Sequence, residues 1–295
     1  MESTYGWSPG VERSYSVPGS GGFSESPSSY TRTDRTEAEG RSAAVAGWKT
    51  AHVSIVVAAR SGAGVVVGVD SRLVIASPAG SWVFDSEHKL VALESVPLLV
   101  GATGVTRAGP WSLARTVEAL GEELEPGAPF DSVATIVSRR VGETFAAATP
   151  PPGAVAEVLL AGYEDGSPRT CSVVVRAGGE ASVQPHEAGL GIVWQGETAA
   201  LDRLIKGIDR SLAAELGGAG RNGRLDHADA EVRFPLDAMP LADVVGLVAS
   251  LVDLAKTYQR LLPGVPTIGG STVVGVCDPD GRISVSELGR VDPSD

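Results

Sequence analysis

Residues 65–69 constrain the fold more than any other part of the sequence, because every position in this run is valine or glycine. A strand with one face in water alternates apolar and polar residues, and this run contains no polar position. Both faces of the strand are therefore expected to be covered. A second apolar run, residues 52–59, precedes it across a short Gly-containing segment, which is typical of a β-hairpin. The sequence thus predicts a hairpin enclosed between other layers of the protein.

The rest of the chain alternates between groups of strands and pairs of helices. Runs rich in β-branched residues and bounded by Gly, Pro or Asp indicate strands, and apolar residues at helical spacing indicate amphipathic helices. The expected strands are residues 90–93, 97–100, 155–163, 169–176, 191–194, 270–277 and 283–288. The expected helices are residues 108–124, a segment that begins at Asp131 or Ser132 and ends before Pro150, residues 197–216 and residues 241–261. This order predicts an α+β fold, a four-layer αββα sandwich of two antiparallel sheets between helical layers.

Composition divides the chain into a tail and one domain. Residues 1–49 are rich in Ser, Gly and Pro, contain no Leu or Ile and show no helical or strand periodicity. Such a segment buries too little apolar surface to offset the entropy lost on ordering, which predicts a disordered tail or a propeptide. Residues 50–289 have the composition of a folded domain, and residues 290–295 form a short C-terminal tail.

Charge and composition exclude several classes of function. The net charge of −12 and the lack of clustered Lys and Arg argue against a nucleic-acid partner, and no apolar stretch is long enough to span a membrane. Cys171 and Cys277 lie far apart without a metal-ligand spacing, which is typical of buried thiols in a reducing cytoplasm. The four histidines do not cluster either, so neither a metal site nor a cofactor is expected.

Four segments together resemble a known family. Residues 64–72 read Gly-Val-Val-Val-Gly-Val-Asp-Ser-Arg, residues 88–90 read His-Lys-Leu, and residues 100–104 read Val-Gly-Ala-Thr-Gly. Later, Ala-Lys-Thr-Tyr-Gln-Arg at residues 255–260 is followed by two glycines and a Val-rich strand. In this order and spacing, the segments resemble the proteasome β-subunit family of N-terminal-nucleophile hydrolases, over residues 50–288.

The resemblance implies a threonine-type peptidase or amidohydrolase that needs no cofactor. In such enzymes the first residue of the mature chain is the nucleophile, and its own α-amino group takes the proton. Carried over, Thr50 is the nucleophile, Asp70 and Lys89 form a supporting ion pair, and the turn at Gly104 supplies an oxyanion donor. Residues 1–49 are then a propeptide. The resemblance also implies a peptide or amide substrate and self-association into a ring or stacked oligomer.

Two alternatives remain open at this level. An alignment with a shorter first hairpin places Ser54, rather than Thr50, at the nucleophile position, and the two residues share the same strand parity. The second alternative is a catalytically inactive subunit or binding module whose tail contacts a partner. Two departures favour it: no glycine precedes Thr50, and residues 261–266 lack the acidic residue and the serine that the resemblance places after the last helix.

Overall fold

The computed structural model of the protein describes residues 54–77, 80–207 and 232–288. These residues form two five-stranded antiparallel sheets, two small two-stranded sheets and four helices. The predicted mixed α/β class with antiparallel sheets is confirmed. Four predicted features lie outside the described residues: Thr50, both tails, residues 208–216 of the helix expected at residues 197–216, and most of the segment before the last helix. Within the described residues, the helix expected at residues 197–216 ends earlier, at Leu204.

The first sheet contains the hairpin that the apolar run predicts. Its strand order is β12-β1-β2-β13-β14, and every neighbouring pair is antiparallel. The bounds are β1 Ile55–Arg60, β2 Val65–Asp70, β12 Gly191–Gly196, β13 Thr272–Cys277 and β14 Ile283–Leu288. Val56 lies opposite Val69 in the hairpin register, and Arg60 lies opposite Val65. Strands β1 and β2 are buried along their whole length.

The second sheet supplies the other half of the protein interior. Its strand order is β11-β10-β9-β6-β5, again antiparallel throughout. The bounds are β5 Leu90–Leu93, β6 Leu98–Gly104, β9 Val155–Glu164, β10 Ser167–Arg176 and β11 Ala181–Pro185.

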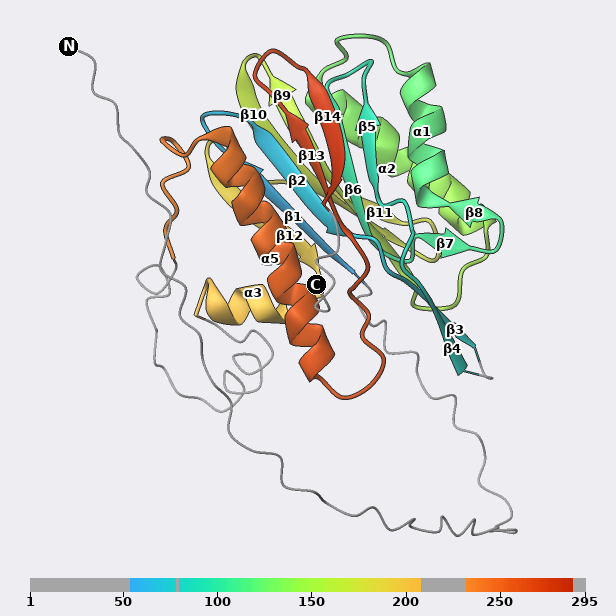
Figure 1. Cartoon of the computed structure of the whole chain (residues 1–295). Helices are drawn as coiled ribbons and strands as arrows, with labels where there is room; N and C mark the ends of the chain where they lie inside the picture. The colour runs from blue at the N-terminus through green and yellow to red at the C-terminus, as the bar shows by residue number, and fades with distance from the viewer. Residues whose placement is uncertain (1–53, 78–79, 208–231, 289–295) are drawn as a thin grey trace, which may run out of the picture. The chain divides into compact units, whose positions relative to one another are not determined.

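The helices lie on different sheets (Figure 1). Helix α5 (Leu241–Leu261) packs on β1, β2 and β13 of the first sheet, and α3 (Ala199–Leu204) packs on α5. Helices α1 (Leu113–Glu123) and α2 (Phe130–Ala147) pack on strands of the second sheet. A third apolar cluster joins side chains of both sheets, among them Val67 of β2 and Leu159 of β9. None of the helices in these ranges is long and apolar enough to cross a membrane.

The consecutive apolar residues of β2 are explained by burial on both faces. Val65, Val67 and Val69 point toward the second sheet, and Val66 belongs to the cluster under α5. Gly68 also faces α5, where a Cβ atom would stand 2.6 Å from Cγ1 of Val248. The glycine in this run therefore allows the helix to approach the strand closely.

Several elements differ from the sequence prediction. The hairpin of β3 (Leu73–Ser77) and β4 (Gly80–Phe84) was not predicted, and neither was β11. Figure 1 shows the β3–β4 hairpin projecting from the body of the domain. Helix α1 begins at Leu113 instead of residue 108, because the short strands β7 (Arg107–Ala108) and β8 (Trp111–Ser112) occupy the preceding residues. Residues 101–104, expected as a turn, continue strand β6.

We expect the close packing at Gly68 to make it intolerant of a side chain. Gly68→Ala should lower the free energy of unfolding by about 1–3 kcal/mol, because the added methyl group collides with a well-packed helix. The matched control is Gly246→Ala in α5, where a Cβ would meet nothing within 4 Å. The free energy of unfolding of that variant should rise by about 0.5–1 kcal/mol, because alanine lowers the entropy of the unfolded chain. Urea unfolding of both variants measures the difference, and equal stabilities would contradict this account of the packing.

Candidate active site

Ser54 lies at the start of β1, with its side chain fully buried. Its carbonyl oxygen accepts a hydrogen bond of 2.9 Å from the N–H of Glu197. Gly196, at the end of β12, has a φ of 91°, and a Cβ there would collide with the Ser54 carbonyl. The backbone of Ser54 has a φ of 118°, which is rare for a residue with a side chain. The start of β1 is thus held tightly in a strained conformation.

The carboxylate of Asp70 lies next to Ser54 at the end of β2. Its Oδ1 accepts hydrogen bonds from the Ser54 hydroxyl, from the N–H of Ile55 at 3.1 Å and from Nζ of Lys89 at 3.2 Å. Its Oδ2 accepts from the N–H groups of Arg72 at 3.2 Å and Gly269 at 3.0 Å. These donors compensate a carboxylate that is fully buried, and burial of an uncompensated charge is costly.

Lys89 directly precedes β5 of the second sheet, and its side chain extends to Ser54 and Asp70. Its Nζ donates to the Ser54 hydroxyl oxygen at 2.8 Å, to Asp70 and to the carbonyl of Arg72. The three hydrogens of the ammonium group are therefore all used. The side chain is buried, and this desolvation lowers the pKa of Lys89; Asp70 and Glu87 oppose the shift, and Arg72 adds to it. A cation near a hydroxyl group stabilises its ionised form, which is what a nucleophilic serine requires.

Arg72, whose N–H donates to Asp70, forms a second ion pair with Asp85. Nε of Arg72 donates to Oδ1 of Asp85 at 2.6 Å, and Nη2 donates to Oδ2 at 2.8 Å. Asp85 follows directly after β4, so it comes from the hairpin that the sequence did not predict. Glu87 is also buried, and the single Nε–H of Arg107 is shared between its two carboxylate oxygens. The sequence analysis singled out neither Asp85 nor Glu87; their positions, four and two residues before Lys89 respectively, are the available signal.

Gly104 does not belong to the group of residues that Asp70 and Lys89 form with Ser54. It lies at the end of β6 with a φ of 71°, and a Cβ there would collide with the carbonyl oxygen of Val155. The neighbouring N–H of Val105 donates to that carbonyl at 2.8 Å. Gly104 therefore allows β6 to approach β9 closely, and no hydrogen bond within the described residues joins it to Ser54. The oxyanion role predicted for Gly104 stays a prediction.

The structure brings three of the residues considered in the sequence into contact. Asp70 and Lys89 form the predicted ion pair, and Ser54, the alternative nucleophile, touches both. Thr50 lies outside the described residues, so its role stays untested. The choice between the two hydroxyl residues depends on the register of the first hairpin. Val56 pairs with Val69, so Ile55 and the preceding Ser54 lie next to Asp70.

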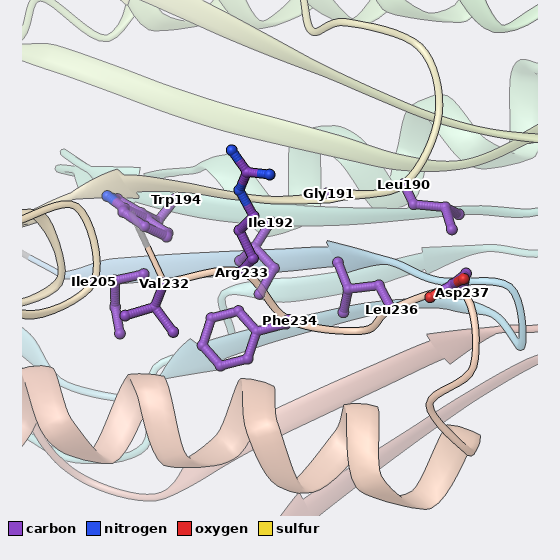
Figure 2. Close-up of a pocket in the computed structure, with 10 residues that line it drawn as sticks. All are labelled: Leu190, Gly191, Ile192, Trp194, Ile205, Val232, Arg233, Phe234, Leu236 and Asp237. Carbon is purple, nitrogen blue, oxygen red and sulfur yellow. The ribbon is translucent and has the colours of Figure 1, made fainter. Parts of the chain in front are cut away.

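Two pockets lie outside the group formed by Ser54, Asp70 and Lys89. The larger, about 320 Å³, is mainly apolar and lies between strand β12 and residues 232–237. Figure 2 shows Trp194, Ile205 and Phe234 among its lining side chains. The smaller, about 260 Å³, is lined by Arg72 and the glycines that follow the last helix. Among the residues that the structure describes, no three His, Cys, Asp or Glu side chains form a group that could hold a metal ion.

Comparison with solved structures shows what the fold resembles. An Anbu (Gly-1) mutant from Hyphomicrobium sp. strain MC1 aligns with a TM-score of 0.53 and 12% sequence identity, covering 82% of this chain and 89% of that protein. Anbu (ancestral beta-subunit) from Yersinia bercovieri aligns with a TM-score of 0.50 and 14% identity, covering 81% of this chain and 88% of that protein. The fold resembles that of Anbu. At these identities, the likeness concerns the fold alone.

The family membership expected from the sequence is wrong. No protein-family model matches the chain, and no curated protein sequence matches it. The segments that resemble proteasome β-subunits do so in short pieces, and the two Anbu structures named above are only 12% and 14% identical to this chain. What the comparisons support is a proteasome-like fold, as in Anbu.

We expect the buried ammonium of Lys89 to leave a signature in the pH dependence of stability. Because its pKa is lower in the folded protein than the ordinary 10.5, the unfolded chain binds more protons between the two values. The free energy of unfolding of the wild type should therefore rise with pH through that window, relative to Lys89→Met. Urea unfolding of both proteins from pH 7 to pH 10.5 measures the difference. Parallel curves would contradict a lowered pKa at Lys89.

Proposed function

We propose that the protein hydrolyses amide bonds, with Ser54 as its nucleophile and Asp70 and Lys89 as supporting residues. The observation that carries this proposal is the distance of 2.8 Å between Nζ of Lys89 and Oγ of Ser54, with Asp70 in contact with both groups. We propose that these residues work within a four-layer αββα sandwich, the arrangement expected from the sequence. The substrate class is a peptide or another amide.

The chemistry follows from the hydroxyl and its neighbours. The Ser54 hydroxyl oxygen attacks the carbonyl carbon of the substrate, and its proton passes to a free α-amino group of Ser54, whose ordinary pKa lies near 8. Protonated Lys89 stabilises negative charge on the oxygen as the proton leaves. The proton then moves to the departing amine, and an ester between Ser54 and the acyl group remains. Water hydrolyses this ester and regenerates the hydroxyl group.

The proposal requires the bond between Val53 and Ser54 to be cut. An acylated nitrogen is not basic, so Ser54 gains its base only when residues 1–53 are removed. The positive φ of Ser54 supports a cut at this bond, because a side-chain-bearing residue in that region costs on the order of 1–3 kcal/mol. Cleavage removes the preceding carbonyl group and with it the cause of the strain. Assembly into a ring or stacked oligomer and a cytoplasmic location stay predictions.

The nucleophile can be identified by a pair of matched substitutions. Purified wild-type protein should have a mass and an N-terminal sequence that begin at Ser54, and it should release the fluorophore from peptidyl-coumarylamide substrates. Ser54→Ala should lower kcat/KM by a factor of about 10³ or more, because the covalent step is lost. Thr50→Ala, which lies in the part removed, should keep the wild-type rate after processing.

The contrary outcomes separate the alternatives. A chain that begins at Thr50, with activity lost in Thr50→Ala, would assign the nucleophile to Thr50. A stable full-length chain without hydrolysis, unchanged by either substitution, would overturn the enzyme proposal and support the alternative of an inactive subunit or binding module.

A further inference from the structure

Arg72 links the β3–β4 hairpin to the residues around Ser54. Its guanidinium group forms a two-pronged pair with Asp85, and hydrogen bonding to Asp85 is the largest cause that raises the pKa of Arg72. Bidentate pairs of this kind fix orientation as well as adding energy. The guanidinium lies against Gly269, where a Cβ would collide with its central carbon.

The backbone of Arg72 touches both charged groups of the candidate site. Its N–H donates to Oδ2 of Asp70 at 3.2 Å, and its carbonyl accepts a hydrogen bond from Nζ of Lys89. Gly269, against which the guanidinium rests, donates to the same carboxylate oxygen at 3.0 Å. A shift of Arg72 would therefore move three of the hydrogen bonds that orient Asp70 and Lys89.

Asp85 contacts this part of the structure through both its side chain and its backbone. Its carboxylate binds the Arg72 side chain, and its backbone carbonyl accepts a hydrogen bond of 2.8 Å from the hydroxyl of Ser71. The Ser71 hydroxyl oxygen in turn accepts from the N–H of Ser271 at 2.8 Å, which ties the loop before β13 to the end of β2. Asp85 itself forms no described hydrogen bond with Ser54, so any effect it has on the nucleophile is indirect.

We propose that Asp85 is a positioning residue, which holds Arg72 so that Asp70 and Lys89 face Ser54. The inference rests on the proposed hydrolase function and deepens it, because it assigns a role to Asp85, the residue that directly follows β4 of the β3–β4 hairpin. In addition, the negative charge of Asp85 offsets the positive charge of Arg72, which acts electrostatically on the buried ammonium group of Lys89.

The charges around Lys89 determine whether the loss of the Asp85 charge raises or lowers the pKa of Lys89. Asp70 and Glu87 raise the pKa of Lys89 and Arg72 lowers it, while Arg107 is paired with Glu87. When Asp85 loses its charge, the positive charge of Arg72 is offset by Asp70 and no longer by Asp85, and the pKa of Lys89 falls further. Since the proposed chemistry uses protonated Lys89, activity should then be lost at a lower pH than in the wild type.

The test compares Asp85→Asn with two other variants. Asp85→Asn should lower kcat/KM by about 10- to 100-fold, the effect of a small misplacement in an active site, and move the alkaline limb of its pH profile to lower pH. Asp85→Glu keeps the charge and should restore most of the profile. The control is Asp131→Asn on helix α2, which removes another carboxylate paired with an arginine. Asp131 lies 3.1 Å from Arg169 of β10, and its substitution should leave the profile unchanged.

A second measurement does not depend on activity. The chain has four lysines, and three of them, Lys89, Lys206 and Lys256, remain after residues 1–53 are removed, so their side-chain signals can be assigned by NMR and titrated. The signal of Lys89 should titrate at lower pH in Asp85→Asn than in the wild type, and Asp85→Glu should reverse the shift. An inactive wild type in which the Lys89 shift is still seen would overturn the proposed function alone. An active wild type with unchanged profile and unchanged Lys89 titration in Asp85→Asn would overturn the role of Asp85 alone.

Discussion

The buried carboxylate of Asp70 is the interaction on which the geometry of the candidate site depends. A fully buried charge is tolerated only when donors surround it, and those around Asp70 come from separate parts of the chain. Ile55 belongs to the strand beside it, Lys89 to the second sheet, and Gly269 to the loop after the last helix. The requirement to satisfy one carboxylate thus ties both sheets and a distant loop to a single point beside Ser54.

Part of this arrangement could be predicted from the sequence. An acidic residue at the end of an all-apolar strand needs a buried partner, and Lys89, at the start of a short apolar strand, is a suitable one. The nucleophile could not be chosen, because Thr50 and Ser54 differ by an even number of strand positions and so share a face. The register of the hairpin, with Arg60 opposite Val65, is what places Ser54 beside Asp70. It depends on the turn at residues 61–64, whose length the sequence leaves ambiguous.

Other features of the site depend on contacts that have no periodic pattern. The pairing of Arg72 with Asp85 joins the two ends of a hairpin whose strands pair with no strand of either large sheet, so no sheet alternation marks it. Gly104 was expected in a turn that supplies an oxyanion donor, but the structure places it at the end of β6, where its close approach to Val155 requires glycine. A sequence can show that a residue type is unusual at a position. It does not show which distant atom makes that residue type necessary.

The Arg72–Asp85 pair closes the β3–β4 hairpin at its base, together with the hydrogen bond of 2.8 Å from the N–H of Glu87 to the carbonyl of Ser71. A loop closed at its base can be lengthened at small entropic cost, since that cost grows only with the logarithm of loop length. Insertions or deletions between β3 and β4 can therefore accumulate without displacing Asp70 or Lys89. This hairpin is where a lineage with this fold could vary the outer surface of the protein and retain the same interior.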